Sequence, residues 1–200
     1  AATPLFVAVD QEGGRVARLK EKSGFPSTLS QKRLGAKADP GRTARQAERT
    51  AKTLAGLGIN LNFAPVVDLD LNPANPVIGM LERSFSRDPE TVSRHALAVI
   101  EAHRRHGVLT APKHFPGHGS AAGDTHEGFV DVTGRWSAVE LKPFERLIRR
   151  GRADMIMTAH VFNGNLDPEW PSTLSRKTLT DLLRRDMGFA GVVVTDDLQM

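Results

Sequence analysis

The chain has 200 residues, of which 40% are hydrophobic and none is cysteine, which suits one globular domain and excludes disulfide frameworks and thiolate metal sites. Its net charge is +4, but 27 Lys and Arg are interleaved with 23 Asp and Glu, a pattern typical of solvated helix faces and not of a nucleic-acid partner. No apolar run approaches the roughly 18 residues of a membrane span.

Short runs rich in apolar and β-branched residues predict buried strands. Their apolar residues are nearly continuous, as in strands that are covered on both faces. The five predicted strands cover residues 5–10, 60–69, 107–114, 153–160 and 191–197.

Helices are predicted between these strands. They run from Asp39-Pro40 to Gly56 or Gly58, from Asp88-Pro89 to Gly107, from the sequence SAVE at 137–140 to Gly151, and from Ser175 to Gly188. Each Asp-Pro pair offers an N-cap with proline at the first helical position, and SAVE matches a capping box. His103 and His106 fall on the second helix, where we expect a solvated face.

Strands that alternate with helices predict a parallel sheet with helical crossovers. The links from helix to strand are short, whereas those from strand to helix have roughly 15 to 28 residues, and loops that long are usually functional. They emerge at the carboxyl ends of the strands, where active sites of parallel α/β folds lie. The residues that end the strands are polar: Asp10, Asp68, Lys113, His114, His160, Asp196 and Asp197.

A TIM-type (β/α)8 barrel fits this pattern best. The alternative is a doubly wound open sheet, but its G-x-G-x-x-G signature is absent, since DQEGGRV follows the first strand. Five strands and four helices make up only part of such a barrel. We therefore expect residues 1–200 to be a single partial catalytic domain, with one βα unit before it and two after it.

The segment APKHFPGHGSAAGDTHEGF (111–129) contains three histidines and admits several interpretations. His114 and His118 have the spacing of two metal ligands on a helix, but the proline and glycines between and around them break a helix, and H-E-x-x-H is absent. A metal site stays an alternative. His118 by itself is better explained as a loop residue whose ring bonds the backbone.

Asp124 and His126 suit acid/base chemistry. Alternate residues of an extended loop point the same way, so the Asp124 carboxylate can accept a hydrogen bond from one imidazole nitrogen while the other exchanges a proton. By spacing alone, an Asp turn beside an exposed histidine fits equally well.

Asp196 ends the fifth strand, a suitable place for a nucleophile, although Asp196 or Asp197 can instead cap a following helix. Further charged residues in the loops at the strand ends are Asp10, Arg18, Arg83, Lys113 and His114. Together these groups fit a ligand with many hydroxyls, since each hydroxyl both donates and accepts. For any single arginine, a surface ion pair is the default interpretation.

The motifs VDQEGGRVARL, NFAPVVDL, ERSFSRDP, KHFPGHG, DTH and GVVVTDDLQM, in this order, resemble family 3 glycoside hydrolases. The bacterial β-N-acetylglucosaminidase (β-hexosaminidase) branch is the most similar, and KHFPGHG followed by D-x-H and D-x-L-x-M is the most specific part. The resemblance covers essentially the whole chain. It implies a (β/α)8 barrel that needs no metal and no cofactor.

The resemblance also implies roles for individual residues. Asp196 would be the nucleophile of a retaining exo-glycosidase, and His126 the proton donor oriented by Asp124. The expected sugar-binding residues are Asp10, Arg18, Arg83, Lys113 and His114. The expected reaction releases terminal β-linked N-acetylglucosamine, with peptidoglycan fragments as substrates.

Three alternatives and two further expectations accompany this prediction. The D-x-H motif favours N-acetylglucosamine, but a β-glucosidase-like or broad-specificity enzyme is the alternative, as is a metallohydrolase. A non-catalytic sugar-binding protein is expected if the molecule has only these residues. We expect a monomer in the cytoplasm, with secretion or a periplasmic location as the alternative, and no nucleic-acid or membrane partner.

Overall fold

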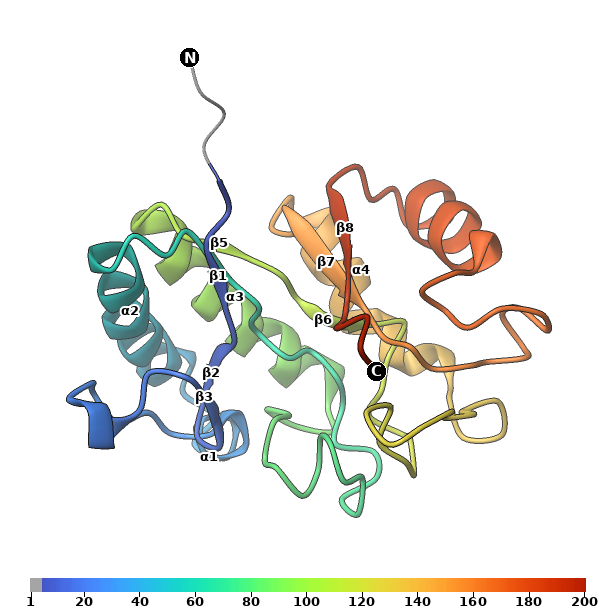
Figure 1. Ribbon diagram of the computed structural model, residues 1–200, viewed down its shortest axis with the longest axis horizontal. Coiled ribbons are helices and arrows are strands. Elements are labelled where there is room, and N and C mark those ends of the chain that lie inside the picture. The colour runs from blue at the N-terminus through green and yellow to red at the C-terminus, as the bar shows by residue number, and fades with distance from the viewer. Residues whose placement is uncertain (1–4) are drawn as a thin grey trace.

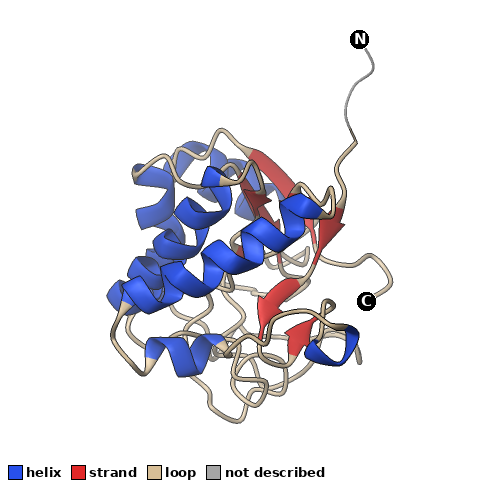
Figure 2. Ribbon diagram, turned by 90° about the vertical axis from the view of Figure 1, so that its left-hand side faces the viewer, coloured by secondary structure: helices blue, strands red, loops and turns tan. Residues whose placement is uncertain are grey.

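The computed structural model describes residues 5–200, in which strands lie side by side across the molecule and most helices gather on one side of them (Figures 1 and 2). The strands are β1 (Ala8–Val9), β2 (Gln11–Gly13), β3 (Val16–Ala17), β4 (Leu61–Asn62), β5 (Leu109–Thr110), β6 (Lys113–Phe115), β7 (Met155–Thr158) and β8 (Val192–Thr195). The helices are α1 (Gln31–Gly35), α2 (Pro40–Gly56), α3 (Pro89–Arg105) and α4 (Lys142–Arg149), joined by the 3-10 turns η1 (Glu21–Ser23) and η2 (Ala138–Leu141) and the π-type helix η3 (Lys177–Asp186). None of the described helices is long and apolar enough to cross a membrane.

The parallel strands follow one another in chain order. One sheet has the order β1-β4-β5 and another the order β6-β7-β8, and an isolated bridge between Val66 and Lys113 joins them. This order is that of a (β/α)8 barrel, of which these strands form a part. A doubly wound sheet is excluded because its strand order reverses at a switch point.

All five predicted strands are present, but the paired segments are shorter than expected. The run at 60–69 pairs in β4 only over Leu61–Asn62, and the run at 107–114 divides into β5 and β6. Pro65 and Pro112 explain both interruptions, because proline has no N–H for the sheet. The residues beyond the pairing therefore lie in loops at the carboxyl ends of the strands.

The predicted helix caps are confirmed in three of four cases. The side chains of Asp39, Asp88 and Ser175 each accept a backbone N–H from the first helical turn, at 2.8 to 2.9 Å. The capping box at SAVE is wrong, since the Ser137 side chain makes no cap hydrogen bond. Glu140 is instead drawn inward, where it accepts backbone N–H groups of the loop at 119–120.

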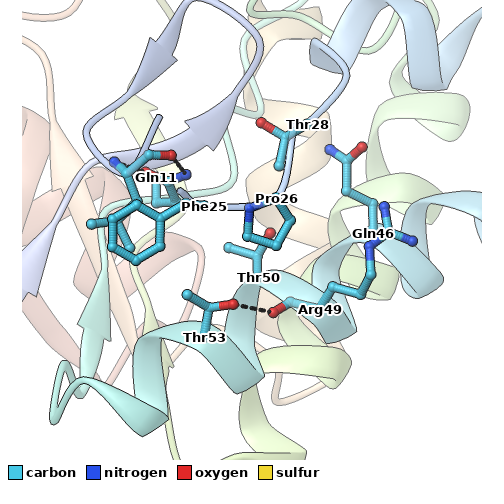
Figure 3. A pocket seen from close by; sticks show the side chains of 9 residues that line it. Gln11, Phe25, Pro26, Thr28, Gln46, Arg49, Thr50 and Thr53 are labelled. Carbon is cyan, nitrogen blue, oxygen red and sulfur yellow. Dashed lines mark hydrogen bonds between the residues drawn. The ribbon is translucent and has the colours of Figure 1, made fainter. Parts of the chain in front are cut away.

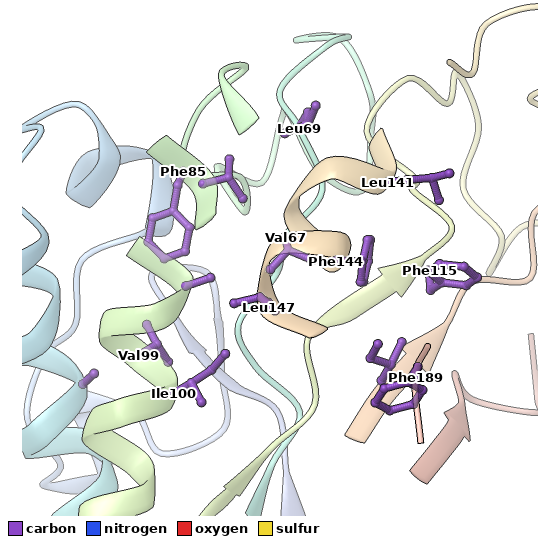
Figure 4. Close-up of a cluster of buried hydrophobic side chains, with 14 of the residues drawn as sticks. Val67, Leu69, Phe85, Val99, Ile100, Phe115, Leu141, Phe144, Leu147 and Phe189 are labelled. Carbon is purple, nitrogen blue, oxygen red and sulfur yellow. The ribbon is translucent and has the colours of Figure 1, made fainter. Parts of the chain in front are cut away.

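The core fills the space between the strands and the helices α3 and α4. Figure 4 shows Phe144 and Leu147 of α4 close to Val67, and the Phe115 and Phe144 rings meet edge to face with their centroids 5.3 Å apart. His103 also belongs to the interior, so its predicted solvated position is wrong. Only 1% of it is exposed, and burial lowers the pKa of its ring to about 4.

Candidate active site

A cavity of about 250 Å³ opens at the carboxyl ends of the strands. All eight predicted catalytic and sugar-binding residues line it: Asp10, Arg18, Arg83, Lys113, His114, Asp124, His126 and Asp196. Parallel strands deliver these side chains to one rim although they are far apart in the sequence. The cavity is therefore the candidate active site.

A second pocket, of about 10 Å³, lies between residues 25–28 and α2 (Figure 3). Phe25, Pro26 and polar side chains such as Thr50 and Gln46 line it, and Arg49 is its one ionisable residue. Without a carboxylate or imidazole it has no group for acid/base chemistry, so it is not the candidate site.

A buried ion network forms one wall of the active-site cavity. The Glu12 carboxylate accepts hydrogen bonds from Arg83 Nε and Nη2 at 2.8 and 2.7 Å, and Lys113 Nζ lies 2.7 Å from Glu12 Oε1. Burial would raise the pKa of Glu12, but the charges of Lys113 and Arg83 outweigh it and hold the pKa at about 2. Lys113 Nζ also donates to Asp10 at 2.7 Å. Lys113 is therefore fixed between two carboxylates, and Arg83 is held by one of them.

The β2–β3 hairpin positions Glu12 in this network and Arg18 at the mouth of the cavity. Its tight turn needs glycine, because Gly14 has φ +60° and a Cβ atom there would lie 2.7 Å from the Ser30 side chain. The Gln11 side chain accepts the N–H of Arg18 at 2.9 Å. The Arg18 side chain is 67% exposed, and its guanidinium lies 3.9 Å from the Asp10 carboxylate at the edge of the cavity.

Asp68 lies behind the cavity wall with no exposed surface. Its carboxylate accepts hydrogen bonds from His114 Nδ1 at 2.6 Å and from the backbone N–H of His118 at 2.7 Å. Burial would raise the pKa of Asp68, but the His114 and His118 contacts outweigh it, and the pKa lies below its usual value. His114 Nε2 lies 3.2 Å from Arg83 Nη2 and 3.7 Å from Asp196 Oδ2.

His118 is buried, with 2% exposure, and burial lowers the pKa of its ring. The prediction that its ring bonds the backbone is wrong, because neither ring nitrogen has a partner within residues 5–200. Its main-chain N–H makes the bond to Asp68 instead.

The predicted contact between Asp124 and His126 is present. Asp124 Oδ1 accepts from His126 Nδ1 at 2.7 Å and from the His126 backbone N–H at 2.8 Å. The segment is a turn and not an extended loop, since the Glu127 N–H also donates to the Asp124 carbonyl. Burial would raise the pKa of Asp124, but the two hydrogen bonds from His126 outweigh it, and the pKa is lowered. His126 Nε2 is the nitrogen that faces away from this pair.

Asp196 follows β8, and its side chain is 23% exposed at the cavity. Burial would raise its pKa, but His114, the Asp197 N–H, Lys113 and Arg83 outweigh burial and lower it. Asp197 starts the next turn, accepting the Gln199 N–H at 2.9 Å. The adjacent aspartates therefore separate, one at the cavity and one in the turn.

The chain matches the Glycosyl hydrolase family 3 N terminal domain over residues 1–200. It belongs to glycosyl hydrolase family 3. It is 40% identical over 213 residues to "Beta-hexosaminidase A" of Pseudoalteromonas piscicida, covering 98% of this chain and 35% of that protein. It is 41% identical over 206 residues to "Beta-hexosaminidase" of Tolumonas auensis, covering 100% of this chain and 59% of that protein.

Solved family 3 structures are similar throughout the chain. A β-N-acetylglucosaminidase from Paenibacillus sp. str. FPU-7 superposes with a TM-score of 0.92 at 40% identity, covering 99% of this chain and 38% of that one. A β-N-acetylhexosaminidase from Beutenbergia cavernae superposes with a TM-score of 0.91 at 40% identity, covering 98% of this chain and 59% of that one. The predicted resemblance and partial barrel are thus confirmed, and the chain spans 35% to 59% of the length of these relatives.

In this family 3 chain, the described residues hold no group of three or more His, Asp or Glu side chains arranged for a metal ion. Instead, each of the three histidines in the segment 111–129 has its own position and its own contacts. The His114 and His118 ring centroids are 6.1 Å apart, and His126 pairs with Asp124. The sequence alone does not assign a role to Glu12, Asp68 or Glu140, although a glutamate beside two glycines at a strand end is a signal that a site is near.

Proposed function

We propose that the protein containing this chain is a retaining exo-glycosidase that hydrolyses terminal β-linked N-acetylglucosamine. The observation that supports it most is one cavity lined by the Asp196 carboxylate, whose pKa is lowered, and by a hydrogen-bonded Asp124–His126 pair. A glycosidase of this kind needs both a nucleophile and a proton donor.

In the proposed first step, Asp196 attacks the anomeric carbon while His126 protonates the leaving glycosidic oxygen. The lowered pKa of Asp196 keeps its carboxylate ionised for attack. Asp124 binds His126 Nδ1, which leaves Nε2 to deliver the proton, and its negative charge stabilises the imidazolium before transfer. Water then hydrolyses the glycosyl-enzyme, and His126 removes its proton.

The proposed sugar-binding groups are Asp10, Arg18, Arg83, Lys113 and His114. Asp10 supplies acceptors, while Lys113 and Arg83 supply donors from positions that Glu12 holds fixed. Such a preorganised set costs little ordering entropy when a polyhydroxylated ring binds.

Relatives named β-hexosaminidase and β-N-acetylglucosaminidase favour N-acetylglucosamine over glucose as the terminal sugar. We propose peptidoglycan fragments as the natural substrates. A β-glucosidase-like specificity is the alternative. The monomeric state and the cytoplasmic location stay predictions.

The test compares an aryl β-N-acetylglucosaminide with the matching glucoside, using the natural full-length protein. We expect turnover of the N-acetylglucosaminide, with a loss of at least about 10³-fold in Asp196→Ala. Near-normal turnover by that variant would show that Asp196 is not the nucleophile. A strong preference for the glucoside would overturn the proposed substrate. Sugar binding without turnover would favour a non-catalytic protein.

A further inference from the structure

Asp68 does not line the cavity, yet it contacts a residue that does. It lies in the loop after β4, and its side chain is completely buried. Besides the bonds from His114 Nδ1 and the His118 N–H, its carboxylate lies 3.3 Å from the His114 backbone nitrogen. It therefore holds both the ring and the main chain of the histidine loop.

The neighbours of His114 determine which ring nitrogen carries the proton. An ionised carboxylate only accepts hydrogen bonds, so His114 Nδ1 donates to Asp68. A guanidinium only donates, so His114 Nε2 accepts from Arg83 Nη2 at 3.2 Å. Arg83 cannot turn away easily, because Glu12 binds it through two nitrogens. Both contacts are satisfied when Nδ1 carries the proton and Nε2 is the acceptor.

The opposite tautomer would disturb the reacting groups. Its Nε2–H would point at the Arg83 guanidinium, which is repulsive, and toward Asp196 Oδ2, 3.7 Å from Nε2. A hydrogen bond to that oxygen would stabilise the carboxylate and make it a weaker nucleophile. With Nε2 unprotonated, His114 accepts a hydrogen bond from Arg83 and offers no donor to Asp196.

We propose that Asp68 is a positioning residue that fixes the Nδ1–H tautomer of His114 and thereby keeps the Asp196 carboxylate free to attack. The proposal rests on the proposed function for the role of Asp196. The tautomer itself depends only on the contacts of Asp68 and Arg83.

The first experiment measures the tautomer in the full-length protein, labelled with ¹⁵N-histidine. Asp68→Asn keeps an oxygen for the His118 N–H and turns an NH₂ group toward His114 Nδ1. We expect the ¹⁵N shifts of the wild-type ring to report a protonated Nδ1, and those of Asp68→Asn a protonated Nε2. A His114→Ala sample assigns the signals. An unchanged tautomer in Asp68→Asn would overturn the proposal.

The second experiment measures kcat and KM on the aryl N-acetylglucosaminide. In Asp68→Asn we expect kcat to fall by at least about 10-fold, since a comparable inversion of a histidine tautomer in a serine protease costs about 10⁴-fold. Asp70→Asn is the matched control, because Asp70 pairs with Lys32 at 2.9 Å outside the cavity. We expect this variant to keep wild-type kcat.

A double-mutant cycle separates positioning from damage to the loop. If Asp68 acts through His114, Asp68→Asn lowers kcat by less than about twofold when His114 is already alanine. An equal loss in both backgrounds would show that Asp68 acts through the loop and would overturn the proposal. A wild-type protein without turnover would refute the proposed function, while the ¹⁵N shifts would still decide on Asp68.

Discussion

The two sides of the cavity are stabilised in different ways. On the ion-network side, Glu12, Arg83 and Lys113 are at most 9% exposed, and their contacts join β2, the loop at 83 and β6. On the other side, Asp124 and His126 are 24% and 59% exposed, and their mutual bonds lie within one turn. The network thus depends on the whole fold, whereas the pair depends on a few neighbouring residues.

This comparison predicts that the two sides respond differently to substitution. Removing one member of a buried ion network leaves a charge without a partner in a poorly solvated place, which destabilises the fold. Removing a member of an exposed pair leaves groups that water can solvate. The following predictions run from the largest to the smallest expected change in the free energy of unfolding.

Glu12→Gln removes the counter-charge of Arg83 and Lys113. We expect the free energy of unfolding to fall by about 3 to 5 kcal/mol, measured by urea denaturation of the full-length protein. Glu21→Gln, at an exposed position of η1, is the control and should change it little. If Glu12→Gln lowers the free energy of unfolding by less than about 1 kcal/mol, the two sides of the cavity do not differ in how they are stabilised.

The buried Glu140 side chain should make the free energy of unfolding depend on pH. Its side chain is buried, and burial, with a contribution from Asp68, raises its pKa to about 7, against 4.5 for an ordinary glutamate. Between these values the folded protein keeps a proton that the unfolded chain has lost, so this contribution to stability is present below pH 4.5 and is lost as the pH rises to 7.

The check compares wild type with Glu140→Gln at pH 4.5 and pH 8, since glutamine does not titrate. We expect the free energy of unfolding of the wild type to fall by about 3 kcal/mol more than that of the variant over this range. Equal changes in the two proteins would contradict the raised pKa.

Arg18→Ala tests a cation at the mouth of the cavity, in contrast to buried Arg83. Because Arg18 is 67% exposed and 3.9 Å from Asp10, the free energy of unfolding should change by less than about 1 kcal/mol. We expect KM for the aryl N-acetylglucosaminide to rise by about tenfold, through one lost charged hydrogen bond. An unchanged KM would place Arg18 outside the sugar site.

His126→Ala should have the smallest effect on stability and a large effect on catalysis. We expect the free energy of unfolding to change by less than about 0.5 kcal/mol, and kcat to fall by about 10² to 10⁴-fold. Glu127→Gln, the next residue and also exposed, is the control for changes in the turn. A fall in stability above about 2 kcal/mol would show that the pair supports the fold as well.

The sequence by itself determined features that depend on neighbouring residues. Asp39, Asp88 and Ser175 cap helices as predicted, because a cap bonds an N–H only two or three residues away. The Asp124–His126 contact is local in the same sense. Apolar runs located the five strands, and the residues that end them reach one rim because the strands are parallel.

Only the tertiary structure decided how remote charges pair. Glu12 and Arg83 are 71 positions apart, and Asp68 and His114 are 46 apart. Glu140 does not cap its helix as expected and instead accepts a backbone N–H from the histidine loop. His103 faces the core. No local pattern contains these contacts, because they depend on which strands are neighbours and on which side of each helix is covered. Burial then makes the pairing necessary, since a charge removed from water needs a partner.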